Sequence, residues 1–490
     1  MDYSVLKSGT DIRGIASDIS GKQINLTDEA VYDITAAFAV WLAKHTSKRA
    51  SGLKIAVGHD SRISAGRISA AVIGALTAAG VTVYDCGLAS TPAMFMTTVD
   101  LDTDGAVQIT ASHHPADRNG LKFFTKSGGL DSADITEILT LAKEGERADS
   151  STGSVQTVDY MSKYAANLRE MICKAVGKTE AEQPLKNKKI VVDAGNGAGG
   201  FYATMVLGKL GADVSASQFL EPDGLFPNHI PNPEDKTAME SITAAVKKSG
   251  ADLGIIFDTD VDRAGCVGSD GAEINRNRLI ALAAAIAVQG SDGAVIVTDS
   301  VTSDGLKEYI ENTLGGVHYR YRRGYKNVIN KAVELCEEGK NCPLAIETSG
   351  HAAFRENYFL DDGAYLVTKI VIELAKGRDI SAMLAPLKLP AEEREVRFKI
   401  HAPDFAAYGQ KVLSELEQFV TMEPDYKIAD DNREGLRVST ENGFFLLRLS
   451  VHDPVMAFNF ESDLPGGIET DIKKLKPFFA QFNELDTSSL

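Results

Sequence analysis

Three aspartates alternate along one short stretch of the chain, in the sequence IIFDTDVDRAG. Asp258, Asp260 and Asp262 follow an apolar run (Leu253 to Phe257) that is typical of a buried strand. Carboxylates this close repel one another unless a cation neutralises them. An EF-hand calcium loop is excluded, because the sixth position is Arg263 rather than glycine and the twelfth is not glutamate. The stretch therefore predicts a Mg²⁺ site with open positions for a phosphate oxygen, the alternative being a solvated acidic loop.

A second polar cluster, TASHHPADRNGLK, follows another apolar run at residues 106–109. Ser112 stands at the transition from strand to loop, where a hydroxyl can be exposed and oriented, and Lys122 follows the turn-prone RNG. A serine near a lysine and a carboxylate-bound cation is suited to accept a phosphoryl group. The pair His113 and His114 is a weak metal candidate, because neighbouring side chains on an extended chain point to opposite sides. We therefore expect Ser112 to be the reactive group and the histidines to shape its loop, where they could hydrogen-bond phosphate.

A third cluster, AIETSGHAAF, carries groups that suit sugar hydroxyls. Alternation along an extended stretch would aim Glu347, Ser349 and His351 to the same side, as paired donors and acceptors for a sugar require. The alternative for His351 is a structural histidine. Basic side chains that a phosphosugar could use also fall beside predicted strand ends. They are Arg13, Arg118, Lys122, Arg263, Arg322, Arg323, Lys326 and Arg448.

One structural unit, a strand followed by a polar turn and a helix, recurs three times and positions these clusters. The first strands are residues 55–57, 190–192 and 294–297, the second strands begin at 81, 212 and 317, and each cluster follows the third strand of its copy. Ligands of open α/β sheets bind beyond the carboxyl ends of the strands. We therefore expect three similar α/β domains with mixed sheets that share one central cleft.

The last hundred residues have a different pattern. A helical stretch (404–420), the alternating segments GFFLLRLS and VMAFNFES, and a closing helix follow a proline-bearing linker near residues 386–390. This pattern predicts a small α+β domain. The predicted domains are residues 1–153 with the serine loop, 154–273 with the aspartate loop, 274–388 with the sugar loop, and 389–490.

Composition limits the possible partners. The 490 residues include 68 acidic and 51 basic side chains, for a net charge of −17, which disfavours nucleic acid and anionic membranes as partners. No stretch approaches 18 uninterrupted apolar residues and no secretory leader pattern opens the chain, so we expect no membrane span. The odd number of cysteines, five, fits reduced thiols in the cytoplasm.

Taken together, these motifs resemble those of the α-D-phosphohexomutases, the phosphoglucomutase/phosphomannomutase superfamily. TASHHP resembles the family's phosphoserine loop, DTDVDR its metal loop, IETSGH its sugar loop and SGTDIRG its N-terminal motif. The segments VGHDSRIS, VVDAGNGAGG, DGLFPNHIPNPE and NGLK also resemble family segments. The resemblance runs through all four predicted domains in order.

The resemblance implies a mutase that interconverts hexose 1-phosphate and hexose 6-phosphate, of glucose, mannose or both. Ser112 would carry the phosphoryl group, Mg²⁺ would bind Asp258, Asp260, Asp262 and the phosphoserine, and a hexose 1,6-bisphosphate would be intermediate and activator. The implied catalytic residues are Ser112, Lys122, Arg13, His113 and Arg263. The implied substrate-binding residues are Glu347, Ser349, His351, Gly324, Tyr325, Lys326, Arg448, Ser450 and His452. Sugar phosphates would be the partners, and the expected state is a monomer or homodimer.

The sequence departs from the family where the far phosphate should bind. In RLSVHDP the residues Arg448, Ser450 and Pro454 match the family loop, but Val451 and His452 replace a Gly-Thr pair, which makes the loop bulkier and poorer in phosphate donors. Three other functions therefore stay open. They are a phosphotransferase that makes hexose 1,6-bisphosphate from a donor such as fructose 1,6-bisphosphate, a phosphoglucosamine mutase, and a non-catalytic sugar-phosphate-binding paralogue.

Overall fold

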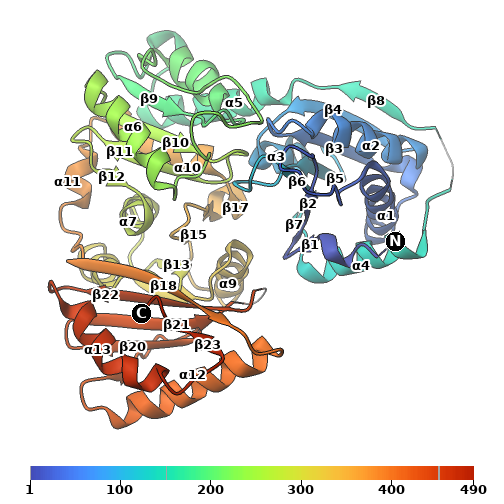
Figure 1. Cartoon of the computed structure of the whole chain (residues 1–490). Helices are drawn as coiled ribbons and strands as arrows, with labels where there is room; N and C mark the ends of the chain where they lie inside the picture. The colour runs from blue at the N-terminus through green and yellow to red at the C-terminus, as the bar shows by residue number, and fades with distance from the viewer. Residues whose placement is uncertain (1, 150–151, 451–452) are drawn as a thin grey trace. The chain divides into compact units, whose positions relative to one another are not determined.

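The computed structural model describes residues 2–149, 152–450 and 453–490 (Figure 1). The chain forms two compact units. Unit 1 consists of Met1–Leu279 and Ser349–Ser381, and unit 2 consists of Ile280–Thr348 and Ala382–Leu490. Among the described residues, no helix combines the length and the apolar character needed to cross a bilayer.

Unit 1 begins with a mixed sheet that carries the serine loop. In order across the sheet, its strands are β1 (Lys7–Ser8), β2 (Asp11–Ile15), β6 (Arg118–Thr125), β5 (Gly105–Ile109), β3 (Lys54–His59), β4 (Thr82–Leu88) and β8 (Ser154–Thr157), with β7 (Gly128–Gly129) beside β6. β3 runs parallel to β4 and β5, whereas β6 is antiparallel to both β5 and β2. The loop between β5 and β6 therefore leaves the carboxyl end of a central strand.

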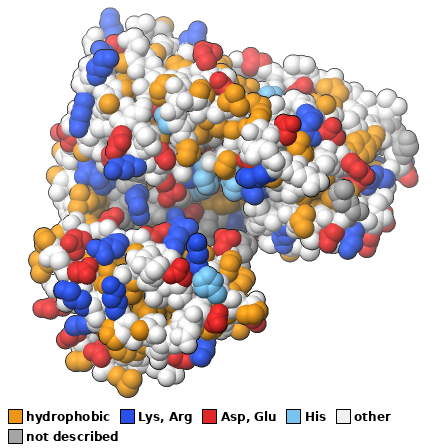
Figure 2. Space-filling model, in the orientation of Figure 1, with side chains coloured by type: hydrophobic (Ala, Val, Ile, Leu, Met, Phe, Trp, Pro, Cys, Tyr) orange, Lys and Arg blue, Asp and Glu red, His pale blue; other side chains and the backbone are white. Residues whose placement is uncertain are grey.

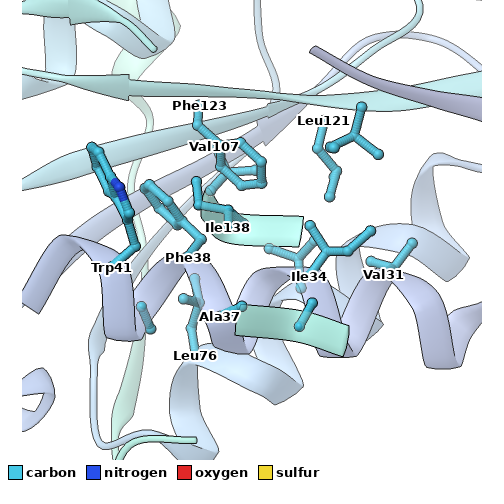
Figure 3. Close-up of a cluster of buried hydrophobic side chains, with 14 of the residues drawn as sticks. Val31, Ile34, Ala37, Phe38, Trp41, Leu76, Val107, Leu121, Phe123 and Ile138 are labelled. Carbon is cyan, nitrogen blue, oxygen red and sulfur yellow. The ribbon is translucent and has the colours of Figure 1, made fainter. Parts of the chain in front are cut away.

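An apolar core holds these strands against the helices α1 (Asp28–Thr46), α2 (Ala65–Ala78) and α4 (Ser132–Glu144) (Figure 3). Thr27 caps α1 by accepting from the Ala30 amide, and the helix presents Phe38 to the sheet, where its ring stacks on Phe123 of β6 at 4.4 Å between centroids. Each fully buried side chain of this size contributes about 1.5–3 kcal/mol. Packing therefore fixes β5, which leads into the Ser112 loop, and β6, which carries Lys122.

The second sheet of unit 1 carries the aspartate loop. Its strands are, in order, β12 (Glu273–Ile274), β11 (Ala264–Gly268), β10 (Leu253–Phe257) and β9 (Ile190–Asp193), and α6 (Lys236–Ser249) packs on it through Met239, Ile242 and Val246. The strand predicted from residue 212 is wrong, because only isolated bridges form there, at Asp213 and Gln218. Asp213 instead accepts from the Ser215 amide, a local turn that competes with strand pairing.

Further helices complete unit 1. They are α3 (Thr91–Asp100), α5 (Tyr160–Val176), the π-helix Tyr202–Leu207 and α10 (Gly363–Ala375), with a hairpin of β16 (Ala352–Phe354) and β17 (Leu360–Asp361). Buried hydrogen bonds join them: the Tyr164 hydroxyl lies within 2.7 Å of both carboxylate oxygens of Asp362, and the hydroxyls of Tyr202 and Thr368 are 2.8 Å apart.

Unit 2 contains the parallel strands β14 (Val317–Tyr321), β13 (Val295–Asp299) and β15 (Leu344–Ile346). Its helices here are α8 (Asp304–Glu308) and α9 (Tyr325–Glu337), with a π-helix at Tyr309–Thr313, while α7 (Arg276–Ala287) and α11 (Ile380–Leu384) lie across the unit limits. The C-terminal sheet runs β19 (Lys427–Ile428), β20 (Leu436–Thr440), β21 (Gly443–Leu449), β22 (Val455–Ser462), β18 (Glu392–Ile400) and β23 (Leu485–Asp486). The helices α12 (Phe405–Met422) and α13 (Gly467–Phe479) cover it.

The predicted fold class is confirmed. In each of the three α/β copies the third strand runs parallel to the first, and an antiparallel α+β domain follows. The single cleft shared by all domains stays a prediction. On the face that Figure 2 shows, Lys and Arg side chains are interspersed with Asp and Glu, so the acidic excess is not gathered there into one patch.

Candidate active site

Ser112 lies three residues after the end of β5, where the chain turns toward β6. Its φ is +51°, in the left-handed region, and its amide donates to Thr110 Oγ1 over 2.9 Å. The residue is buried, and its Oγ donates to Asp258 Oδ2 over 3.2 Å. The same oxygen is 3.2 Å from His113 Nδ1 and 3.4 Å from Arg263 Nη2. The predicted reactive hydroxyl thus lies among a carboxylate, an imidazole and a guanidinium.

The aspartate loop joins β10 to β11 and brings Asp258, Asp260 and Asp262 together. One oxygen from each lies within 4.8 Å of the others, and all three residues are buried. Burial, followed by the charge of Asp262, raises the pKa of Asp258, and the same two causes raise the pKa of Asp260 to about 6. Burial is also the largest influence on Asp262 and opposes its ionisation, but the neighbouring groups, Lys122 first among them, together outweigh burial and lower the pKa of Asp262. The three clustered carboxylates therefore differ in how readily they ionise, and their mutual repulsion is unfavourable.

The chemistry of this loop fits a divalent cation. Within the described residues, Asp260 Oδ1 and Asp262 Oδ1 are buried atoms that receive no hydrogen bond. Unpaired buried carboxylate oxygens are costly, and a hard cation with oxygen ligands satisfies them. Among the described residues this is the one group of three acidic, histidine or cysteine side chains with metal-binding geometry.

Two predicted cations lie beside the triad. Lys122 is on β6, and its Nζ is 3.3 Å from Asp262 Oδ2 and 3.4 Å from Asp11 Oδ2. Arg13, on β2, donates to the same Asp11 oxygen over 2.8 Å. The strand register explains this meeting, since Arg13 pairs with Gly120 on β6, two residues before Lys122. Sequence reasoning missed Asp11, which holds both cations.

The sugar-loop residues divide between the units. In unit 1, Ser349 Oγ lies 2.9 Å from His351 Nδ1, and His351 Nε2 is 3.8 Å from Asp262 Oδ1. Burial lowers the pKa of His351 to about 3, so the ring is neutral at pH 7. The expected extended stretch is wrong, because the chain turns after Glu347 and Gly350 has a φ of +94°.

In unit 2, Glu347 Oε1 accepts the Gly324 amide over 2.6 Å, immediately before Tyr325 and Lys326 begin α9. Arg448 is the last residue but one of β21, and within the described residues its buried Nε–H donates no hydrogen bond. Burial, and then the charge of Arg323, lowers the pKa of Arg448.

The altered loop is only partly described. The amide of Ser450 donates to the Val455 carbonyl over 2.9 Å, and Ser450 Oγ accepts from the Asp453 amide over 3.2 Å. His452, a predicted substrate-binding residue, lies outside the described residues, as does Val451.

Several supporting residues had not been predicted. Thr91, the first residue of α3, donates its hydroxyl to Asp260 Oδ2 and its amide to the Asp260 carbonyl over 2.8 Å. Arg62 contacts the Ser112 loop through backbone carbonyls. Two sequence signals were available for these residues. STPA, at the start of α3, resembles a helix cap, and VGHDSR contains Arg62. Residue types alone do not show which groups either segment contacts.

Gly197 supports the aspartate loop by its lack of a side chain. A Cβ added there would lie 2.6 Å from the Thr259 carbonyl oxygen and 2.8 Å from Thr259 Cα. The neighbouring Ala198 amide donates to the same oxygen over 2.8 Å. The glycine-rich turn after β9 therefore sets the position of the peptide between Asp258 and Asp260.

Gly197→Ala is expected to lower the free energy of unfolding by about 1–3 kcal/mol, as overpacking does, and to weaken Mg²⁺ binding. Urea unfolding and a Mg²⁺ titration followed by thermal shift measure the two effects. Gly66→Ala in α2 is the matched control, because its Cβ meets open space and alanine favours a helix. Unchanged stability and Mg²⁺ affinity in Gly197→Ala would contradict this account.

Comparisons with known proteins agree with this fold. Family models of the three phosphoglucomutase/phosphomannomutase α/β/α domains match residues 7–149 (domain I), 162–271 (domain II) and 275–388 (domain III). A phosphoglucomutase of Neisseria gonorrhoeae is 32% identical over 464 residues, which cover 94% of this chain and 93% of the relative. A phosphomannomutase/phosphoglucomutase of Pseudomonas aeruginosa is 29% identical over 484 residues, or 98% and 95% of the two chains.

Among solved structures, a phosphoglucomutase/phosphomannomutase family protein from Burkholderia thailandensis matches with a TM-score of 0.80 and 27% identity. The match covers 97% of this chain and 98% of that one. The chain therefore belongs to the phosphoglucomutase/phosphomannomutase family within the α-D-phosphohexomutases. It is an enzyme of the phosphotransferase type. The resemblance noted in its sequence motifs is confirmed.

Proposed function

We propose that the chain is a Mg²⁺-dependent phosphohexomutase that interconverts the 1- and 6-phosphates of glucose, mannose or both. The proposal includes a phosphoserine at Ser112 and a hexose 1,6-bisphosphate that is intermediate and activator. The observation that supports it most directly is the position of Ser112 Oγ, which contacts both Asp258 and Arg263. A nucleophile between a metal-binding carboxylate and a guanidinium suits phosphoryl transfer, which depends on positioning and charge neutralisation.

The chemistry proceeds in two matched halves. In the first, the bond from Ser112 Oγ to phosphorus breaks as the free hydroxyl of a hexose monophosphate forms a bond to phosphorus, giving the bisphosphate. In the second, after the bisphosphate has turned around, its other phosphoryl group returns to Ser112 Oγ. The hydroxyl proton released in the first half is returned in the second, so the cycle consumes none.

The neighbours of Ser112 have separate roles in this proposal. Bound Mg²⁺, held by Asp258, Asp260 and Asp262, would supply charge neutralisation at the phosphoryl oxygens. Arg263, 3.4 Å from Ser112 Oγ, contacts the phosphoryl group from another side. Lys122 assists proton transfer, while Arg13 stabilises phosphate charge and His113 orients the serine hydroxyl.

The remaining predicted residues hold the sugar and its far phosphate. Glu347, Ser349 and His351 bind sugar hydroxyls, because they offer a carboxylate, a hydroxyl and a neutral imidazole. The far phosphate is assigned to Arg448, Ser450 and His452, and Gly324, Tyr325 and Lys326 are assigned to the substrate loop. The predicted domain limits, the cytoplasmic location and the monomer or homodimer state remain predictions.

A second function is favoured by the sequence of the C-terminal loop. Val451 and His452 are bulkier than the Gly-Thr pair they replace and offer fewer phosphate donors. An enzyme that holds the far phosphate weakly would release the bisphosphate. The second candidate is therefore a phosphotransferase that makes hexose 1,6-bisphosphate from a donor such as fructose 1,6-bisphosphate.

One experiment tests both functions. The phosphorylated enzyme is incubated with each glucose and mannose monophosphate, with and without fructose 1,6-bisphosphate, and intact protein mass and sugar products are followed together. A mutase converts the 1- and 6-phosphates in both directions while the protein stays largely phosphorylated. A bisphosphate synthase accumulates hexose 1,6-bisphosphate in proportion to the donor consumed. Absence of both product patterns at saturating substrate and Mg²⁺ would contradict the proposal.

A further inference from the structure

Arg62 lies beneath the Ser112 loop with a side chain that has no exposed surface. Its guanidinium makes five hydrogen bonds, four of them to main-chain carbonyls of the loop. The acceptors are Asp60 Oδ2 at 3.2 Å from Nε, the carbonyls of Pro115 at 2.7 Å and Arg118 at 2.9 Å from Nη1, and the carbonyls of His114 at 2.6 Å and Ser112 from Nη2. The ring of Phe226 covers the guanidinium carbon at 5.3 Å.

The number of donors explains why an arginine occupies this position. A guanidinium carries five N–H donors in a rigid plane, and here each faces one acceptor. The carbonyls of Ser112, His114 and Pro115 belong to an irregular loop and that of Arg118 to the first residue of β6, and buried carbonyls need partners. A lysine has three donors on one nitrogen and cannot reach five acceptors spread over this plane.

A closed ring of hydrogen bonds links Arg62 to both main-chain groups of Ser112. The Ser112 amide donates to Thr110 Oγ1 over 2.9 Å, and that hydroxyl donates to Asp60 Oδ2 over 2.7 Å. Arg62 Nε donates to the same carboxylate oxygen, and Arg62 Nη2 donates back to the Ser112 carbonyl. Because the N–H and C=O of one residue are both fixed, its φ of +51° is held although serine disfavours this region.

We propose that Arg62 is a positioning residue for phosphoryl transfer, which acts through the Ser112 main chain and sets the direction of Ser112 Oγ. The inference rests on the proposed function, because it holds that this ring of hydrogen bonds serves the phosphoryl-transfer step. All five guanidinium hydrogen bonds of Arg62 go to acceptors within the protein. Its effect is therefore on the rate of transfer rather than on the binding of sugar phosphates.

Arg62→Lys is the first test, with Arg67→Lys as its matched control. Arg67, on the nearby α2, also donates to two main-chain carbonyls, those of Ala16 and Leu26, but none belongs to the Ser112 loop. Arg62→Lys is expected to lower kcat about 100-fold, the scale of a displacement near 1 Å, with KM changed less than about threefold. Amide hydrogen exchange in peptides covering residues 110–118 is expected to accelerate at least about tenfold, with exchange in β3 unchanged. Arg67→Lys is expected to change neither.

A second pair of variants covers the case in which Arg62→Lys does not fold. Thr110→Val removes the hydroxyl that links Ser112 to Asp60, and is expected to lower kcat with the same faster exchange of the loop. Thr110→Ser restores the hydroxyl and is expected to recover kcat to within about threefold. A folded Arg62→Lys or Thr110→Val with wild-type kcat and wild-type loop exchange overturns the proposal. If the wild type itself interconverts no hexose phosphates, the proposed function fails, and loop exchange alone then decides whether Arg62 fixes Ser112.

Discussion

Replacing Ser112 with alanine is expected to abolish hexose phosphate interconversion, with kcat reduced by at least about 10⁴-fold. The reason is that in the proposed mechanism Ser112 Oγ forms and breaks the bond to phosphorus, and among the described residues no other hydroxyl contacts both Asp258 and Arg263. The coupled assay of product formation and intact protein mass measures the loss. The variant should also acquire no phosphoryl group from a hexose bisphosphate.

Ser112→Gly separates the chemical role of this position from its main-chain role. Both variants lack the hydroxyl, so both are expected to be inactive. Glycine occupies φ of +51° without the steric cost that alanine has, so Ser112→Gly is expected to be more stable than Ser112→Ala by about 1 kcal/mol in urea unfolding. Substantial turnover by either variant would remove Ser112 from the mechanism, and equal stability would contradict the left-handed conformation.

The elements that carry the site were predictable because they follow simple periodicity. Short apolar runs that end in polar turns mark parallel strands: β5 ends three residues before Ser112, and β10 ends directly before Asp258. The segment from residue 212 stands where the repeated unit predicts a second strand but forms no regular strand, because Asp213 makes a turn with Ser215. A local side-chain hydrogen bond of this kind competes with strand pairing, and strand propensity alone does not reveal it.

The proposed reacting groups follow from residue types and spacing, whereas the groups that hold them do not. Three alternating aspartates repel one another and so predict a cation, which makes the triad recognisable from spacing alone. Arg62 donates mostly to main-chain carbonyls, and every residue has one, so no residue type along the chain marks its partners. Asp11 meets Lys122 only through the register of β2 and β6, which depends on tertiary structure.

Asp260→Asn is expected to reduce phosphoryl transfer by about 10³-fold or more, because a bound cation supplies several kcal/mol of charge stabilisation in such reactions. Asparagine still accepts the hydrogen bond from the Thr91 hydroxyl, so the loop keeps that anchor. Saturating Mg²⁺ should raise the melting temperature of the wild type and shift that of the variant much less. Asp235→Asn, at the cap of α6, is the control, since asparagine caps a helix as well as aspartate does.

In the metal-free protein, Asp260→Asn should raise the free energy of unfolding although it lowers activity. Folding raises the pKa of Asp260 to about 6, so its ionised form is disfavoured in the folded state. This cost is absent below about pH 4, grows between the ordinary pKa of 3.8 and the raised pKa of about 6, and is complete at pH 8. Without metal at pH 8, Asp260→Asn is therefore expected to be more stable than the wild type by about 1–3 kcal/mol, a difference that disappears near pH 4. If Asp260 had only a structural role, Asp260→Asn would lower stability together with activity. A metal-free variant less stable than the wild type at pH 8 would therefore show that the triad is not a cation site.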